Sequence, residues 1–404
     1  MEKQLKPAIR FKGFTDPWEL RKFSDLAETR RGLTYNPSSI SDSGIRVLRS
    51  SNIAEDQFID GEDDVFVEPD AVNIPKVTQG DILITSANGS TRLIGKHAII
   101  RDIPNNSAVH GGFMLLAVAR NPEFVNALMS APWYTKFISL YVAGGNGAIG
   151  NLNKSDLDDQ DVYVPENTEQ MVIGQYFSQL DHLITLHQRK YDKLQVIKKA
   201  MLEKMFPQNG SNVPEIRFRG FTDPWEQRKL GEVGSVSMCR RIFKEQTSES
   251  GDIPFYKIGT FGGQPDAYIS RELFAEYKAK YPYPKEGDIL LSASGSIGRT
   301  VEFSGKNEYF QDSNIVWLSH DDNLDNAFLK CFYSIVKWAG IEGSTIKRLY
   351  NDNILNTKII LPSVDEQKQI GAFFKELDTL ITLHQRELEK LQKIKKAMLE
   401  KMFV

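Results

Sequence analysis

The sequence predicts an α+β protein with two β-rich globular parts in tandem, each followed by a long helix. Three observations lead to this prediction. A heptad-patterned stretch at residues 173–205 recurs at residues 370–402. A stretch that opens at Pro7 recurs at Pro214, ahead of each heptad stretch. Between these markers lie short apolar runs that follow Gly-Asp turns, which is typical of strands. Because internal repeats reveal architecture, we expect the order globule, helix, globule, helix.

Length and composition are those of an ordinary folded protein. The 404 residues are enough for about two to three domains, each with its own core. The chain is 41% hydrophobic and 25% charged, without a low-complexity run. We expect the first globular part at residues 1–165, its helix at 166–208, the second globular part at 209–362 and its helix at 363–404.

The two long helices carry an apolar stripe with alternating steps of four and three residues, the spacing of a coiled-coil seam. Two seam positions are histidines, which we interpret as polar residues that fix helix register, because no further metal or catalytic side chain is patterned beside them. The predicted seam consists of Ile173, Phe177, Leu180, Ile184, His187 and Leu194 in the first helix, and Ile370, Phe374, Leu377, Ile381, His384 and Leu391 in the second.

Two blocks are identical between the helices. Residues 183–189 repeat as 380–386, and residues 198–206 repeat as 395–403. A solvated helix needs only its pattern of polar and apolar residues, so letter-for-letter identity indicates that both surfaces meet the same kind of partner. A recent duplication that has not yet diverged is the alternative explanation.

Strands are predicted at residues 45–49, 80–85, 253–258 and 287–292, and helices follow near 123–142 and 324–338. The repeated Asp-Pro-Trp at residues 16–18 and 223–225 predicts a turn that runs into a short helix, since Asp caps helices and Pro suits the first helical position. The repeated segments at the start and end of each globular part match closely, whereas the residues between them show little identity. This difference is expected if the residues between them set two different specificities.

Basic, amide and hydroxyl side chains near the predicted strands and loops are candidate nucleic-acid contacts. Such side chains read base edges and bind phosphates, and loops after strands are where recognition residues concentrate. The net charge of −3 means that any such surface is a local basic patch on a near-neutral body. For each residue a surface or loop-capping role is the alternative. The candidates are Arg46, Arg49, Asn88, Ser90, Arg92, Lys96, Lys257, Ser294, Ser296, Arg299, Lys347 and Arg348.

No motif requires an enzyme. Residues 145–150 match G-x-G-x-x-G but lack the preceding strand and following apolar helix of a dinucleotide site, and residues 89–96 have the wrong spacing for a phosphate loop. Cys239 and Cys331 are too few for a disulfide framework or a zinc site. With no signal peptide or membrane span in view, we expect a cytoplasmic, metal-free protein.

Taken together, the motifs resemble those of a known family. They are Arg-Phe-x-Gly-Phe-Thr-Asp-Pro-Trp-Glu at residues 10–19 and 217–226, the Gly-Asp-Ile-Leu strands, Leu-Pro-x-x-x-Glu-Gln at 361–367, and the repeated helices. In this order and duplication they resemble the DNA-specificity subunit of type I restriction–modification enzymes over essentially the whole chain. The first copy departs slightly, with Val-Pro in place of Leu-Pro at residues 164–165.

The resemblance implies that each globular part is a target-recognition domain for one half of a bipartite, asymmetric DNA sequence. It implies that the helices pair as an antiparallel coiled coil with pseudo-twofold symmetry. Two methyltransferase subunits and two restriction/translocase subunits would be partners. S-adenosylmethionine, ATP and magnesium would belong to those partners, and this chain would bind no cofactor and catalyse nothing. The rival hypothesis is a two-armed coiled-coil protein–protein scaffold, which the near-neutral charge supports.

Overall fold

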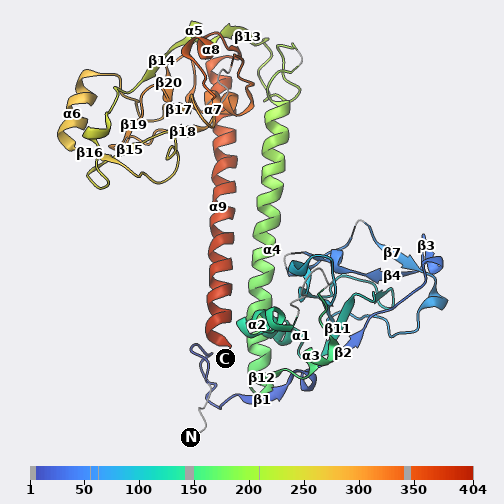
Figure 1. The fold of residues 1–404 in the computed structure, drawn as a ribbon. Helices are drawn as coiled ribbons and strands as arrows, with labels where there is room; N and C mark the ends of the chain where they lie inside the picture. The colour runs from blue at the N-terminus through green and yellow to red at the C-terminus, as the bar shows by residue number, and fades with distance from the viewer. Residues whose placement is uncertain are drawn as a thin grey trace. The chain divides into compact units, whose positions relative to one another are not determined.

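The computed structural model describes residues 6–54, 56–61, 63–141, 150–208, 210–340 and 347–403. The chain divides into two compact units. Unit 1 comprises Met1–Gln188 with Arg386–Val404, and unit 2 comprises Arg189–Gln385. Each unit therefore contains one β-rich part and segments of both long helices, α4 (Asn167–Lys204) and α9 (Val364–Met402), which are green and red in Figure 1.

A four-stranded antiparallel sheet forms the centre of the β-rich part of unit 1. Its order is β2 (Ala27–Arg31), β11 (Met114–Ala119), β8 (Ile82–Thr85) and β9 (His97–Ile99), with Leu115 opposite Ile84. A second sheet has the order β10 (Ala108–His110), β4 (Ile45–Leu48), β7 (Val65–Val67) and β3 (Ile40–Ser41), in which β10 and β4 run parallel. The short strands β5 (Ile53–Ala54) and β6 (Gln57–Phe58) form a separate pair.

Unit 2 repeats this arrangement. Its four-stranded antiparallel sheet has the order β14 (Gly234–Met238), β20 (Ile315–His320), β17 (Ile289–Ser292) and β18 (Thr300–Glu302). The second sheet has the order β16 (Tyr268–Ile269), β15 (Ile253–Tyr256) and β19 (Tyr309–Phe310), in which β15 and β19 run parallel. The strands predicted from the sequence are therefore confirmed as β4, β8, β15 and β17.

Strands β8 and β17 are apolar along their whole length because both of their faces are covered. Ile82 and Ile84 face the core that contains the helices, whereas Leu83 faces a second core against Leu48 and Leu116. In unit 2, Ile289 and Leu291 face the helix side and Leu290 faces the opposite core. Burial on both faces accounts for runs that do not alternate with polar residues.

Shorter helices accompany each central sheet, and in unit 2 they supply both cores, with Phe328 of one helix on the side of Ile289 and Phe274 of another on the side of Leu290. The pattern near residues 123–142 folds as two helices, because Pro132 opens the second and cannot continue the first. In unit 2, Asp325 caps a helix by accepting a hydrogen bond from the amide of Phe328 at 2.8 Å. The helices are α1 (Pro122–Met129), α2 (Pro132–Tyr141), α3 (Lys154–Asp158), α5 (Leu230–Val233), α6 (Arg271–Lys280), α7 (Asn326–Ile335) and α8 (Asn351–Leu355).

The prediction of a short helix after each Asp-Pro-Trp is wrong, because a strand follows both copies. Strand β1 (Glu19–Lys22) follows the first copy and pairs antiparallel with β12 (Asp161–Val164). Strand β13 (Glu226–Lys229) follows the second and pairs with β21 (Lys358–Leu361). The local capping pattern is overridden because each segment is extended by pairing with a strand far along the chain.

Within each unit the segments of α4 and α9 run antiparallel. In unit 1, Phe177 contacts Phe403 and Asp181 pairs with Lys395. The residue numbers of the partners therefore increase along α4 while they decrease along α9. In unit 2, Lys198 pairs with Asp378 and Phe206 packs near Phe374, again in reverse order. The predicted seam residues are all buried or half-buried in the helices.

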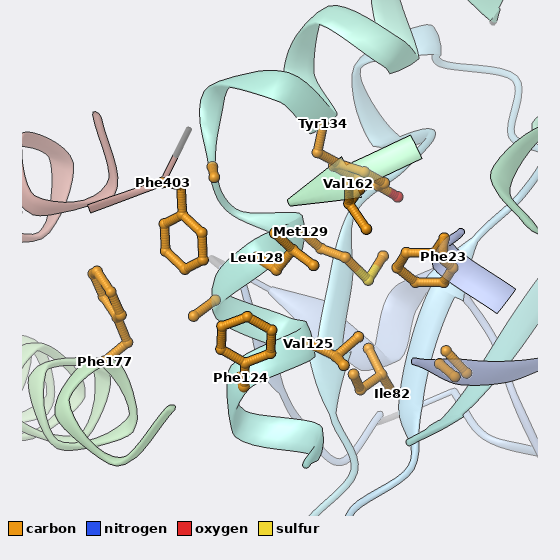
Figure 2. Packing of buried hydrophobic residues seen from close by; sticks show 14 of the residues in the cluster. Phe23, Ile82, Phe124, Val125, Leu128, Met129, Tyr134, Val162, Phe177 and Phe403 are labelled. Atoms are coloured by element: carbon orange, nitrogen blue, oxygen red, sulfur yellow. The ribbon is translucent and has the colours of Figure 1, made fainter. Parts of the chain in front are cut away.

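The end of each long helix is held by four aromatic side chains, which we call the aromatic anchor. In unit 1, Phe403 lies 6.0 Å from Trp18, 6.0 Å from Phe124 and 5.8 Å from Phe177 between ring centroids. Figure 2 shows Phe124 of α1, Phe177 of α4 and Phe403, which directly follows α9, facing one another. In unit 2 the same anchor consists of Phe206, Trp225, Phe328 and Phe374. The identity of residues 198–206 and 395–403 is thus explained in part by contacts within the chain.

A buried ion pair and a close helix approach complete this frame. Arg10 makes two hydrogen bonds of 2.7 and 2.6 Å to Glu169, whose side chain is fully buried, and Arg217 repeats them with Glu366. A Cβ atom on Gly174 of α4 would lie 2.6 Å from the amide nitrogen of Phe124. Only glycine allows α4 to approach the start of α1 so closely.

Candidate nucleic-acid interface

Four loops of unit 1 converge at one end of its central sheet, and we call this set loop cluster 1. The amides of Ser86 and Ala87, after β8, both donate to the carbonyl oxygen of Phe113, just before β11. The amide of Gly111 donates to Leu48 O at the end of β4, and the amide of Leu33, after β2, donates to His110 O. The ends of four strands are therefore tied together by main-chain hydrogen bonds.

Loop cluster 2 is built from the corresponding loops of unit 2. The amide of Ala293, after β17, donates to Asn314 O, just before β20, at 2.8 Å. The amide of Gln311 donates to Tyr256 O at the end of β15, and the hydroxyl of Tyr309 donates to Arg240 O, two residues after β14. The two clusters occupy equivalent places on equivalent strands, although their side chains differ.

Two candidates from the second sheet of unit 1 are tied to acidic residues. The guanidinium of Arg46 lies 2.8 Å from Asp60 and 2.6 Å from Asp64, and its side chain is 13% exposed. Arg49 donates to the main-chain oxygen of Asp63. Arg46 is occupied by two carboxylates, which favours a structural role for it in the free protein.

The other candidates of unit 1 lie in loop cluster 1 or beside it. Asn88 donates to Ser50 Oγ at 3.0 Å and accepts a hydrogen bond from the amide of Ser90, so its side chain orders the loop. Ser90 and Arg92 are exposed, and Lys96 is half-buried. Within the described residues, the Arg92 side chain has no hydrogen-bond or ion-pair partner. Arg92 is thus an exposed cation of this loop region.

Among the candidates of unit 2, Ser294 and Arg299 are held within the protein. Ser294 is buried and donates to Asn314 Oδ1 at 2.7 Å, and Arg299 donates to Phe261 O at 2.6 Å. Lys257 pairs with Asp266 at 2.9 Å, although both side chains are substantially exposed. Ser296 is exposed, and its carbonyl oxygen accepts a hydrogen bond from the Ser292 hydroxyl.

Lys347 and Arg348 are exposed and belong to loop cluster 2. Arg348 forms a β-bridge with Ser294, and Lys347 O accepts a hydrogen bond from the amide of Gly295. Sequence reasoning missed two further exposed cations at this end of the sheet, Arg240 and Arg241, whose guanidinium groups lie over the rings of Tyr281 and Phe243. Their interleaving of basic and aromatic residues was the available signal. Arg240, Arg241, Lys347 and Arg348 are thus exposed cations of loop cluster 2, and Arg241 lies 3.8 Å from the carboxylate of Asp312.

Two histidines of unit 1, His97 and His110, are buried. Burial lowers the pKa of His110 to about 4, and burial also lowers the pKa of His97, so both imidazoles are neutral near neutral pH. Within the described ranges, no three His, Cys, Asp or Glu side chains are grouped to hold a metal ion. The rejected phosphate-loop match leads into strand β9 and not into a helix, and the G-x-G-x-x-G match lies almost wholly outside the described residues.

Comparison with models of known protein families identifies the family to which this chain belongs. The profile described as type I restriction modification DNA specificity domain matches residues 15–196 and again residues 222–393. The chain belongs to this family. Its two specificity domains thus each extend from a β-rich part into the following long helix. DNA target recognition is the function of this family, which favours that function over the protein–protein scaffold.

Individual relatives agree with the family assignment. A putative type I restriction enzyme specificity subunit of Haemophilus influenzae is 61% identical over 153 residues, which are 38% of this chain and 40% of that protein. The putative type I restriction enzyme MjaX specificity subunit of Methanocaldococcus jannaschii is 24% identical over 412 residues, 94% of this chain and 91% of that one. The crystal structure of an S subunit from M. genitalium shares the fold, with a TM-score of 0.63, 14% identity and 99% of each chain covered.

Among the described residues, no helix combines the length and the apolar character that crossing a membrane would require.

Proposed function

We propose that this specificity subunit recognises a bipartite, asymmetric DNA target, and that the β-rich part of each unit reads one half of it. The observation that carries the proposal is the repetition of the loop cluster. The ends of β8 and β4 in unit 1, and of β17 and β15 in unit 2, are joined to the cluster by equivalent main-chain hydrogen bonds, yet the side chains that the two clusters present differ. Two similar frames with different side chains suit two related readers of two different half-sites.

The electrostatics of the two clusters agree with this role. Arg92 in loop cluster 1, and Arg240, Arg241, Lys347 and Arg348 in loop cluster 2, are exposed cations next to polar loop residues. Such side chains bind phosphates and base edges. Because the net charge is −3, we expect the isolated chain to bind DNA weakly and partner subunits to add much of the affinity.

We assign the partners by their fit to the repeated helices. Leu183 and Leu186 of α4, and their counterparts Leu380 and Leu383 of α9, are 41%, 38%, 37% and 51% exposed and lie in an identical block. Identical exposed leucines in both helices suit two copies of one partner, the methyltransferase subunit. Two restriction/translocase subunits would complete the complex. S-adenosylmethionine, ATP and magnesium would be bound by those partners, and this chain would act in the cytoplasm without catalysing a reaction.

Methylome sequencing tests the proposal. Cells that make this chain together with its methyltransferase subunit should carry methylated adenine or cytosine in one asymmetric motif of two specified halves separated by an unspecified gap. Cells with the methyltransferase subunit alone are the control and should lack the motif. A continuous motif, or the same methylation without this chain, would contradict the proposal.

A further inference from the structure

Phe113 of loop cluster 1 is 72% exposed, more than any other large hydrophobic side chain of the described residues. A single exposed apolar side chain is common on protein surfaces and needs no function. The backbone that presents this ring is what sets it apart. Its carbonyl oxygen accepts hydrogen bonds from both Ser86 and Ala87, at 2.9 and 3.1 Å. An exposed ring is thus held on a fixed main chain.

The turn that carries Phe113 is also held from its other side. The amide of Met114 donates to Gly111 O at 2.8 Å, which closes the turn, and the amide of Gly111 donates to Leu48 O at 2.9 Å. A Cβ atom on Gly32 would lie 1.9 Å from Gly111 O, so only glycine lets the chain after β2 approach the turn this closely. Three neighbouring strand ends therefore fix the position of the turn.

Loop cluster 1, to which Phe113 belongs, also contains polar groups. Asn88, Ser50 and Ser90 are linked by hydrogen bonds in the loops that the Phe113 carbonyl helps to hold. An apolar partner protein would leave these groups without water or a matching partner, which costs free energy. A duplex offers polar base edges and phosphates next to apolar surfaces, namely thymine methyl groups and the faces of bases at a deformed step.

The equivalent position in unit 2 has opposite chemistry. Asn314 also precedes its strand and accepts the equivalent main-chain hydrogen bond from Ala293. Its side-chain oxygen accepts hydrogen bonds from Ser294 at 2.7 Å and from Arg348 at 3.5 Å. The same place in the frame thus holds an apolar ring in one unit and a polar network in the other, as expected of a position that sets specificity.

We propose that Phe113 makes an apolar contact with one base pair of the half-site read by unit 1, and thereby sets specificity at that position. This inference rests on the proposed function. The ring packs either on a thymine methyl group in the major groove or between two base pairs that it partly unstacks. Both arrangements use the same rigid apolar group, and the two can be told apart by experiment.

The test uses the reconstituted complex of this chain with its methyltransferase subunit and duplexes that carry the methylated motif. Phe113→Ala removes the ring. Leu20→Ala is the matched control, since Leu20 is also an exposed apolar residue of unit 1, at 54%, but lies on β1 outside the loop cluster. Thermal unfolding of both variants should match the wild type, because an exposed side chain contributes little to stability.

We expect Phe113→Ala to weaken cognate binding about 5- to 100-fold and to abolish discrimination at one base pair of one half-site. Leu20→Ala should change neither. Replacing thymine by deoxyuridine at that base pair reproduces the loss if the ring contacts a methyl group. If the ring instead enters between two base pairs, 2-aminopurine placed at that step should become more fluorescent on binding of the wild-type complex, and not on binding of Phe113→Ala.

Unchanged affinity and discrimination in the Phe113→Ala complex would overturn the inference. An equal loss on cognate and random duplexes would also overturn it, because a base contact must depend on sequence. Either result would leave the proposed function standing as long as the wild-type complex methylates its bipartite motif. Failure of the wild type to discriminate any sequence would instead refute the proposed function itself.

Discussion

Lys395 and Asp181 form an ion pair between α9 and α4 in unit 1, with 2.7 Å between Nζ and Oδ1. Lys198 and Asp378 form the equivalent pair in unit 2 at 2.5 Å. Each side chain of the first pair is 16% exposed, so water screens it only partly. Burial raises the pKa of Asp181 although Lys395 opposes the shift, which shows that desolvation outweighs the attraction at this carboxylate.

The first prediction concerns this pair. A double-mutant cycle with Asp181→Ala and Lys395→Ala should give a coupling free energy of about 0.5–3 kcal/mol in urea unfolding. The exposed pair Arg21 and Glu19, with side chains 53% and 67% exposed, serves as the control and should give less. Additive effects of Asp181→Ala and Lys395→Ala would show that the pair does not couple the two helices.

The aromatic anchor gives the second prediction. Phe403→Ala should destabilise unit 1 by about 3–5 kcal/mol, because it leaves a cavity between Trp18, Phe124 and Phe177. Phe206→Ala should cost unit 2 a similar amount. The control is Phe243→Ala, since Phe243 is 57% exposed, and thermal unfolding is the measurement. A loss for Phe403→Ala as small as that of the control would mean that the end of α9 is not anchored.

The third prediction separates two arginines of unit 1. Arg92→Ala should weaken DNA binding of the methyltransferase complex without changing its unfolding, because Arg92 has no partner among the described residues. A base contact would cost about 1–3 kcal/mol at one position of one half-site, whereas a phosphate contact would lower the salt slope by about one unit for all sequences. Arg46→Ala should instead destabilise unit 1, since it leaves Asp60 and Asp64 without their cation. A stability loss for Arg92→Ala together with a loss of DNA binding alone for Arg46→Ala would contradict both assignments.

The fourth prediction is a pH dependence that arises from His110. Its pKa is lowered to about 4 in the folded chain, from 6.5 when unfolded. The unfolded state therefore binds a proton first as pH falls, so stability is complete above about pH 6.5 and declines toward about pH 4. The loss from this group is on the order of 3 kcal/mol. His110→Gln should flatten, but not abolish, the decline in urea unfolding free energy, because buried His97 titrates in the same direction. An unaltered slope in His110→Gln would contradict the assignment.

Patterns that repeat along the chain predicted much of the fold. The heptad stripe located α4 and α9, and the apolar runs at Ile82 and Ile289 located the central strands, because burial dictates those residue types directly. Contacts between distant segments were beyond such patterns. The segments after Trp18 and Trp225 are strands only because β12 and β21 lie beside them.

The candidate site shows the same division. Residue type and loop position identified Arg92, Lys347 and Arg348 as exposed loop cations. Residue type and loop position could not reveal that Asp60 and Asp64 form ion pairs with Arg46, because those ion pairs depend on how the chain between these residues folds. Nor did they single out Phe113, an apolar residue that would ordinarily be assigned to the core and that only the geometry shows to be exposed.

The central claim is that each β-rich part reads its own half of a bipartite target. The most direct measurement is methylome sequencing after exchange of residues 15–160 for the first specificity domain of another family member, with the rest of this chain and its methyltransferase subunit unchanged. One half of the methylated motif should change to that of the donor, while the other half stays as in the parent. A motif in which both halves change, or neither does although the chimera is folded and active, would contradict the account.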